Sequence, residues 1–191
     1  MREALKLFIL FIPLIAFIFY SSRLKKSYFS ILVSLYLISL IAISFFDVAK
    51  NISDNYSHPP EGDFLAFWMN GRAALSGENF YNAKTFQEIE LPYNPSDGFR
   101  EEIIDVGFWY PPFAMFLFLP LGLANFSNAF LIWQIVNVVF CFVCIYEIWK
   151  LSLREYGILS LFLIAALFLM LTPTRNTFHF AQTNFIALLF F

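Results

Sequence analysis

Three short polar stretches carry the side chains that could do chemistry in an otherwise apolar chain. Asp63 begins an aromatic-rich segment, Trp109 and Tyr110 precede a proline pair, and residues 175–184 combine a cation, an imidazole and two amides. A carboxylate can take a proton from a hydroxyl, Arg pairs with phosphate oxygens, and amides bond hydroxyls, while aromatic faces stack on sugar rings. This combination suits a sugar carried on a lipid phosphate.

Each candidate also has a plain structural interpretation. Asp is a preferred N-cap residue, so Asp63 could serve only to begin a helix. Arg175 could anchor its loop to lipid headgroups, and His179 could be a packing residue. Gln182 and Asn184 could cap the last helix or bond across a bundle.

The composition indicates a membrane protein. Of 191 residues, 60% are hydrophobic and 14% are charged, with 27 Phe, and the mean hydropathy is +0.68. Soluble domains carry about 25% charged residues. The net charge of −2 and the lack of a long basic run exclude a nucleic-acid partner. Cys141 and Cys144 lie in an apolar span without a second ligand pair, so we expect packing residues and no structural zinc.

Apolar runs predict membrane-spanning helices. We expect an anchor helix early in the chain, because a signal peptide would need a small-residue cleavage site that is missing after residue 20. The three further predicted crossings are followed by the first residues of another helix. The predicted helices comprise residues 4–20, 28–46, 127–149, 157–172 and 185–191.

Charge predicts the orientation of these helices. Residues 21–27 are basic, which places them in the cytoplasm, so residues 47–107 form an extracytoplasmic loop that carries short juxtamembrane helices. Residues 108–124 contain three prolines and are too interrupted to cross, so we expect a re-entrant or juxtamembrane helix there. Residues 173–184 form a second extracytoplasmic loop. The polar stretches then share one side of the membrane.

The predicted fold class is therefore all-α, a polytopic transmembrane helix bundle in a single domain. Gln134 and Asn137 are three residues apart and share a helix face, so we expect them to hold helices together. Phe67, Trp68 and Trp109 could be aromatic-belt anchors at the membrane surface. The last apolar run is too short to span, which suggests the N-terminal part of a longer protein.

Three motifs, in matching order after residue 60, resemble glycosyltransferase family 87 of the GT-C superfamily. Gly62-Asp63-Phe64, with the small residues that follow, resembles the aspartate-containing first outer loop of that family. Trp109-Tyr110-Pro111-Pro112 with Leu119-Pro120-Leu121 matches its Tyr-Pro-Pro segment and following Pro-Leu. Ala181-Gln182-Thr183-Asn184 resembles its Gly-Gln-x-Asn motif and departs from it at Ala181.

The resemblance implies a GT-C-like enzyme that moves a hexose, expected to be mannose, from a polyprenyl-phosphate donor to a lipid or glycan acceptor with inversion. Asp63 would be the general base, and Arg175 and His179 would stabilise the departing phosphate. The remaining substrate-binding residues would be Trp109, Tyr110, Gln182 and Asn184. We expect no metal and no cofactor, because the leaving group is a phosphate monoester.

The expected location is the plasma membrane, among membrane lipids, with an extracytoplasmic active site. A lipid or solute transporter is the main alternative, and a non-catalytic membrane scaffold is a third. A transporter would show charged or broken helices near the middle of the bilayer. No acid or base falls at the centre of a predicted helix, which favours the enzyme.

Overall fold

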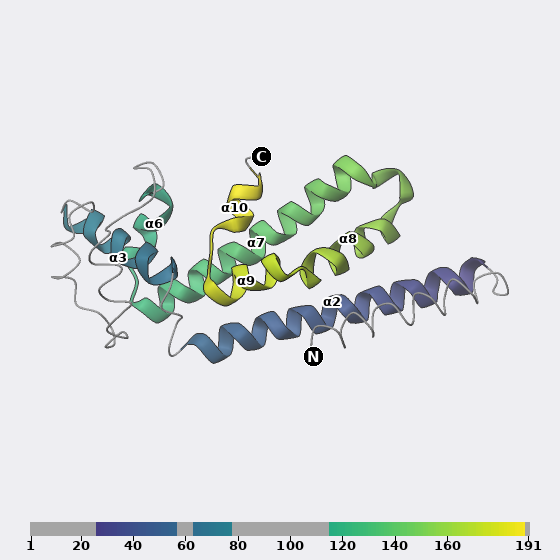
Figure 1. The fold of residues 1–191 in the computed structure, drawn as a ribbon, viewed down its shortest axis with the longest axis horizontal. Coiled ribbons are helices and arrows are strands. Elements are labelled where there is room, and N and C mark those ends of the chain that lie inside the picture. The colour runs from purple at the N-terminus through teal and green to yellow at the C-terminus, as the bar shows by residue number, and fades with distance from the viewer. Residues whose placement is uncertain (1–25, 57–62, 78–114, 190–191) are drawn as a thin grey trace.

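The computed structural model describes residues 26–56, 63–77 and 115–189, and within these ranges it contains helices and no strand. The helices form an elongated bundle (Figure 1). The predicted class, an all-α transmembrane helix bundle, is confirmed. The predicted helix at 4–20 lies outside the described residues. The helices are α2 Lys26–Tyr56, α3 Asp63–Ser76, α6 Met115–Gly122, α7 Phe126–Ser152, the 3-10 turn η2 Arg154–Tyr156, α8 Ile158–Met170, α9 Thr172–Phe180 and α10 Asn184–Leu189.

Two helices, α2 and α7, are long and apolar enough to cross a membrane. Each contains a 27-residue candidate span, Ser30–Tyr56 and Phe126–Ser152. At 1.5 Å per residue each span is about 40 Å long, more than the roughly 30 Å of a hydrocarbon core. A third candidate arises if α8 and α9, which are bent by 60° at their junction, are taken together.

Helix α2 differs from its predicted bounds at its C-terminal end. It continues through Asp47 and Asn51 to Tyr56, ten residues beyond residue 46, where the apolar run stops. Hydropathy marks where a helix leaves lipid, not where its backbone hydrogen bonds end. The extra turns are supported from α7, because the Tyr56 hydroxyl donates to Asn128 Oδ1 at 2.9 Å.

Residues 173–180, predicted as part of a loop, belong to helix α9, Thr172–Phe180. Pro173 lies in its first turn, where the missing N–H has no helical partner in any case. The residue before the helix, Leu171, is extended and produces the bend from α8. Pro173, directly after the predicted crossing that ends at residue 172, therefore lies in the first turn of a new helix at an angle to α8.

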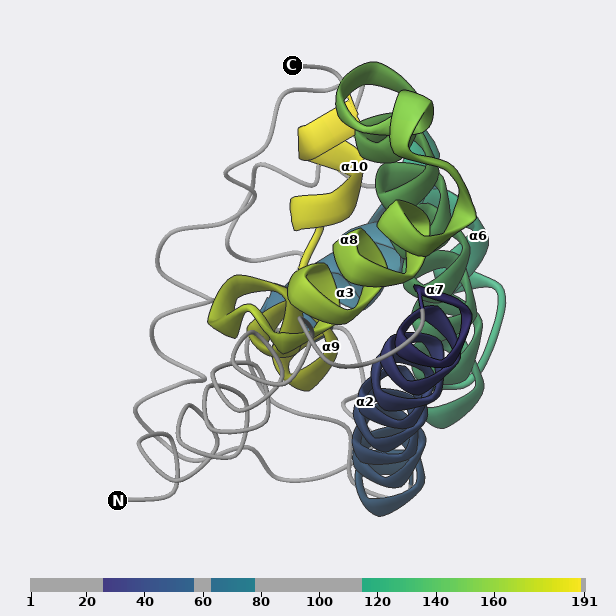
Figure 2. The same ribbon diagram turned by 90° about the vertical axis from the view of Figure 1, so that its right-hand side faces the viewer.

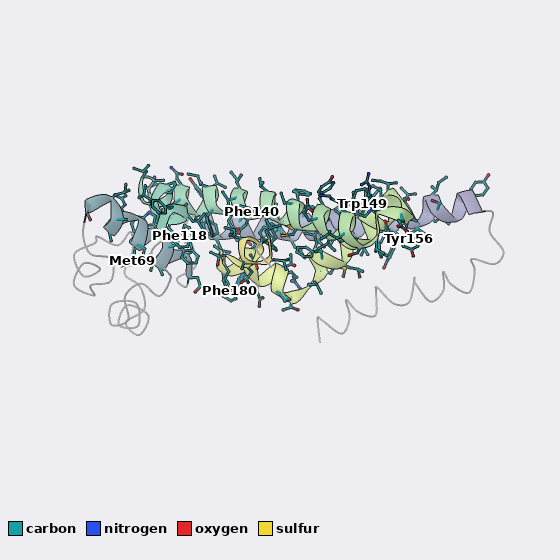
Figure 3. The ribbon with its side chains drawn as sticks, turned by 90° about the horizontal axis from the view of Figure 1, so that it is seen from above. Met69, Phe118, Phe140, Trp149, Tyr156 and Phe180 are labelled. Atoms are coloured by element: carbon teal, nitrogen blue, oxygen red, sulfur yellow. The ribbon has the colours of Figure 1, made fainter. Side chains whose placement is uncertain are left out.

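A compact aromatic block joins α3, α6 and the first turns of α7. The α3 and α6 backbones touch at Gly71 and Gly122, and a Cβ on Gly71 would clash with the carbonyl oxygen of Phe118. Around this contact Phe67 stacks on Phe118 with ring centroids 4.2 Å apart. Figure 3 shows Met69 and Phe118 together at this end of the molecule. We refer to the buried cluster as the aromatic block; it consists of Phe64, Phe67, Trp68, Met69, Phe118, Leu121, Phe126, Phe130 and Trp133.

The bundle has two distinct ends along its long axis (Figure 1). Helices α3 and α6 lie at one end with the last turn of α2, whereas the α7–α8 connection and the first turn of α2 lie at the other. Lys26, Lys150 and Arg154 belong to that second end by their places in α2, α7 and η2. Seen along this axis, α2 and α10 lie at opposite edges of the bundle (Figure 2).

Candidate functional site

Asp63 is the first residue of α3, and its carboxylate meets a residue from the far end of the chain. Gln182 Nε2 donates to Asp63 Oδ2 at 3.0 Å across 119 positions of sequence. Asp63 is exposed and Gln182 is half-buried. An acid in the first turn also interacts favourably with the helix dipole, so the structural role of Asp63 at a helix start coexists with this contact.

The contact belongs to a chain of hydrogen bonds whose direction can be assigned. The Thr177 hydroxyl donates to Pro173 O at 2.9 Å, so its oxygen accepts from Asn184 Nδ2 at 3.0 Å. Asn184 Nδ2 also donates to Gln182 Oε1 at 2.9 Å. The amide nitrogen of Gln182 must then point to Asp63, which acts as an acceptor, as a carboxylate does. Asp63 is therefore held at one oxygen by a fixed amide.

Helix α7 holds the turn that presents Gln182. Trp133 Nε1 donates to Ala181 O at 2.7 Å, and Gln134 Nε2 donates to Phe178 O at 2.7 Å. Both side chains are buried, where a lost partner is expensive. The prediction that Gln134 links helices is confirmed for α7 and α9. The same prediction for Asn137 is not met, because its side chain has no hydrogen-bond partner among the described residues. Ala181 is left-handed, with φ 52°, which reverses the chain after α9.

The aromatic block fixes the start of α3 from the other side. Phe64, next to Asp63, packs on Phe126 and Phe130 with centroids 5.3 and 5.4 Å away. Trp68 is 4% exposed and its indole N–H donates to Ala124 O at 3.0 Å. The aromatic-belt interpretation of Phe67 and Trp68 is wrong, because both side chains are buried in the protein.

Arg175 and His179 are one turn apart on α9 and face a different space. They line a cavity of about 550 Å³ between α2, α8 and α9, together with Asp47 and Asn51 of α2. The cavity is polar at this end and apolar toward Leu40. Sequence reasoning placed all the polar loop residues around one pocket. The described residues instead form two groups, Asp63 with Gln182 and Asn184, and Arg175 with His179, on either side of the end of α9.

The tautomer of His179 follows from its neighbours on α2. Asn55 Nδ2 donates to the backbone carbonyl of Asn51 and to Asn51 Oδ1. Asn51 Nδ2 is then the atom 2.9 Å from His179 Nδ1, so that ring nitrogen accepts. The neutral imidazole carries its proton on Nε2, which can donate to a ligand.

Three residues beside the predicted site residues were not identified from the sequence. Thr177 is 1% exposed and anchors the amide chain, and Asp47 and Asn51 line the cavity. Asp47 and Asn51 are four apart, so a longer α2 would have placed them on one face. Trp109 and Tyr110 lie outside the described residues. In the part of the chain that the structure describes, no group of three His, Cys, Asp or Glu residues could hold a metal ion.

Comparison with known proteins gives one family match and two similar relatives. The sequence model of glycosyltransferase family 87 matches residues 108–191, which confirms the predicted resemblance over that part. Two relatives are polyprenol-phosphate-mannose-dependent alpha-(1-2)-phosphatidylinositol pentamannoside mannosyltransferases, from Mycobacterium tuberculosis (33% identical over 88 residues) and Mycolicibacterium smegmatis (35% over 86 residues). Each match covers 43% of this chain and 20% of the relative, so the match spans about a fifth of the relatives' length. No solved structure matches the chain significantly.

Proposed function

Because residues 108–191 carry the sequence pattern of glycosyltransferase family 87, we propose that the protein is a membrane glycosyltransferase that uses polyprenyl-phosphate mannose. The names of the two mycobacterial relatives support this donor, and they support a lipid-linked glycan as the acceptor. The apolar α2 and α7 support an integral membrane location. The plasma membrane is the proposed site of action.

Asp63 acts as the general base in this proposal. Gln182 holds Oδ2, and Oδ1 takes the proton of the acceptor hydroxyl as its oxygen attacks the anomeric carbon. The bond from that carbon to the phosphate oxygen breaks on the opposite face, and the phosphate leaves with the electron pair. The configuration is inverted. A positioned base typically contributes about 10² to 10⁴ in rate.

The leaving phosphate is stabilised by the second group of residues. Arg175 supplies a cation suited to phosphate oxygens, and the Nε2–H of His179 supplies a further donor. His179 and Gln182 are three positions apart, so a hexose on the phosphate can extend past the end of α9 toward Asp63. Asn184 orients Gln182, and the proposed roles of Trp109 and Tyr110 in sugar binding complete the substrate site. No metal is required in this scheme.

The active site faces the extracytoplasmic side in this proposal. The support is the charge at the two ends of the bundle. Lys26, Lys150 and Arg154 lie at the end opposite to α3, and basic residues accumulate on the cytoplasmic side of membrane proteins.

The observation that carries the proposal is the hydrogen bond between Gln182 and Asp63. It brings an acid from the first outer segment to an amide of the family-matched region. The test measures transfer of labelled mannose from polyprenyl phosphate in membranes that contain the complete protein. Asp63→Asn keeps an oxygen that accepts from Gln182 but cannot act as a base. We expect transfer to fall at least about 100-fold.

The matched control is Asp54→Asn, which neutralises an exposed acid of α2 outside both groups. It should transfer at the wild-type rate. Equal transfer by wild type and Asp63→Asn would remove Asp63 as the base. Movement of the lipid-linked sugar across the bilayer without transfer would instead support a transporter.

A further inference from the structure

A second cavity adjoins the one that contains Arg175 and His179. It has a volume of about 590 Å³ and lies between α2 and α8. Leu40 of α2 and Met170 of α8 line both cavities. The two cavities are therefore neighbours along α2, on either side of Leu40 and Met170, and we call them together the α2–α8 groove.

The α2–α8 groove changes character along its length. One end has Arg175, His179, Asn51 and Asp47. Beyond Leu40 the walls are mainly aliphatic side chains, from α2 (Leu32, Val33, Leu37) and from α8 (Leu163, Ala166, Leu167).

The distal cavity has few polar groups in its walls, and the Ser160 hydroxyl among them is already hydrogen-bonded within the protein. The Ser160 hydroxyl is bonded inside the protein, accepting from Trp149 Nε1 at 3.0 Å and donating to Leu153 O at 2.8 Å. Tyr36 and Tyr156 add aromatic rings to the walls. Figure 3 shows Tyr156 and Trp149 near the end of the bundle remote from Met69 and Phe118.

The length of the groove matches the depth of a membrane. From Leu32 to Asn51, α2 rises about 28 Å, close to the roughly 30 Å of a hydrocarbon core. The spanning window of α2 is only 11% buried, against 44% for α7, so the other described helices cover little of its apolar surface.

These features fit one kind of ligand. We propose that the α2–α8 groove binds the isoprenoid chain of the polyprenyl-phosphate donor, with the phosphate beside Arg175 and His179. Asp47, at the same end, can accept hydrogen bonds from hydroxyls of the attached sugar. Beyond Leu40 the described residues form one apolar cavity, which fits the single chain of a polyprenyl lipid. This inference rests on the proposed function for the identity of the donor.

The first test varies the chain length of the donor and blocks the groove. Leu163 is 40% exposed and lines the distal cavity, so Leu163→Trp can fill it without disturbing a buried position. For a long-chain donor we expect KM to rise about tenfold, the effect of displacing roughly two methylene groups. A short-chain donor that ends near Leu40 should be unaffected. Ile135→Trp, at a 56% exposed position of α7 outside the groove, is the control.

Equal effects on both donors, or none on either, would overturn the inference. Leu32→Trp, on the opposite wall and 51% exposed, provides a second variant with the same expected pattern. If Leu163→Trp and Leu32→Trp both raise KM for the long-chain donor only, the cause is blockage of the groove, because a local defect in α8 would not be produced by a substitution on α2.

The second test reads binding without transfer, so it stands even if Asp63 is not the base. A photoreactive polyprenyl phosphate without sugar is cross-linked to the complete protein in nanodiscs, and the labelled peptides are mapped. We expect labels on α2 and α8 that Leu163→Trp removes and Ile135→Trp retains. Excess unlabelled polyprenyl phosphate should compete, and phosphatidic acid should not. Equal labelling of the exposed face of α7, or equal competition by phosphatidic acid, would refute the groove.

Discussion

The aromatic block and the α2–α8 groove are built from similar apolar residues but pack in opposite ways. In the block, Phe64, Phe67, Phe118 and Phe130 are at most 1% exposed, and two helix backbones touch through glycines. Along the groove, α2 and α8 pack through a small buried cluster of Leu37, Leu40 and Ala166, and two cavities remain beside it. The block suits a part that must hold Asp63 at a fixed position. The groove suits a part that must admit a long ligand.

The largest structural effect is expected where the block is tightest. In Gly71→Ala the new methyl would meet backbone atoms of Phe118 and Gly122, which cannot rotate away. We expect a loss of about 3 kcal/mol or more and loss of transfer, because α3 no longer docks on α6. Gly157→Ala is the control without a steric clash, since only its backbone conformation, with φ 74° and ψ −169°, opposes a side chain there, at about 1–3 kcal/mol. Thermal unfolding in detergent compares them, and equal losses would contradict the account.

Truncation of one large side chain in each region sharpens the contrast. Phe67→Ala should lower the free energy of unfolding by about 3–5 kcal/mol, because the block cannot collapse into the space. Leu163→Ala on the wall of the groove should cost less than about 1 kcal/mol, since its side chain is 40% exposed. Denaturation in matched micelles measures both. Similar costs would mean that the groove is packed like the block.

Two buried amide side chains on α7, Gln134 and Asn137, should respond to substitution by leucine with smaller changes in the free energy of unfolding, and the two changes should have opposite signs. Gln134→Leu removes the donor to Phe178 O and should destabilise by about 1–3 kcal/mol. Among the residues that the structure describes, neither side-chain polar atom of Asn137 has a hydrogen-bond partner, although the residue is 0% exposed. Asn137→Leu should therefore be neutral or stabilising, by up to about 1 kcal/mol. Thermal unfolding of both variants measures whether each one is destabilised or stabilised. Strong destabilisation by Asn137→Leu would contradict the view that the Asn137 side chain lacks a hydrogen-bond partner.

The smallest effect is expected at Ala181, where two terms oppose each other. Ala181→Gly relieves a left-handed backbone at about 1 kcal/mol but removes a buried methyl worth about 0.8 kcal/mol. The melting temperature should change little. A large loss would show that the Ala181 methyl supports the turn beyond its burial.

The sequence predicted the class of fold well because hydropathy and charge are strong signals over a long span. It also proposed Asp63, Gln182 and Asn184 as site residues, through motifs that resemble a family, and the structure brings these three side chains together. It did not predict the end of α2 or helix α9, because both consist of polar residues in helical conformation outside the apolar runs. Pro173 was read as a stop signal, but the same chemistry favours a first turn.

The division of the site into two groups was beyond sequence reasoning. It depends on the direction of side chains on α9, where Arg175 and His179 face α2 and Thr177 faces Asn184. The directions of these side chains could not be predicted as long as residues 173–184 were interpreted as a loop, because a loop has no fixed helical spacing. The burial of Phe67 and Trp68 was missed for a related reason, since an aromatic near a predicted boundary can face lipid or a neighbouring helix, and only the position of α6 decides between them.

The most direct test of the central claim is a double-mutant cycle on the rate of mannose transfer. If Gln182 acts by holding the Asp63 carboxylate, Gln182→Leu should reduce kcat about tenfold in the wild-type background. In the Asp63→Asn background it should reduce kcat no further. Independent, multiplicative losses, or a wild-type rate in Asp63→Asn, would contradict the account.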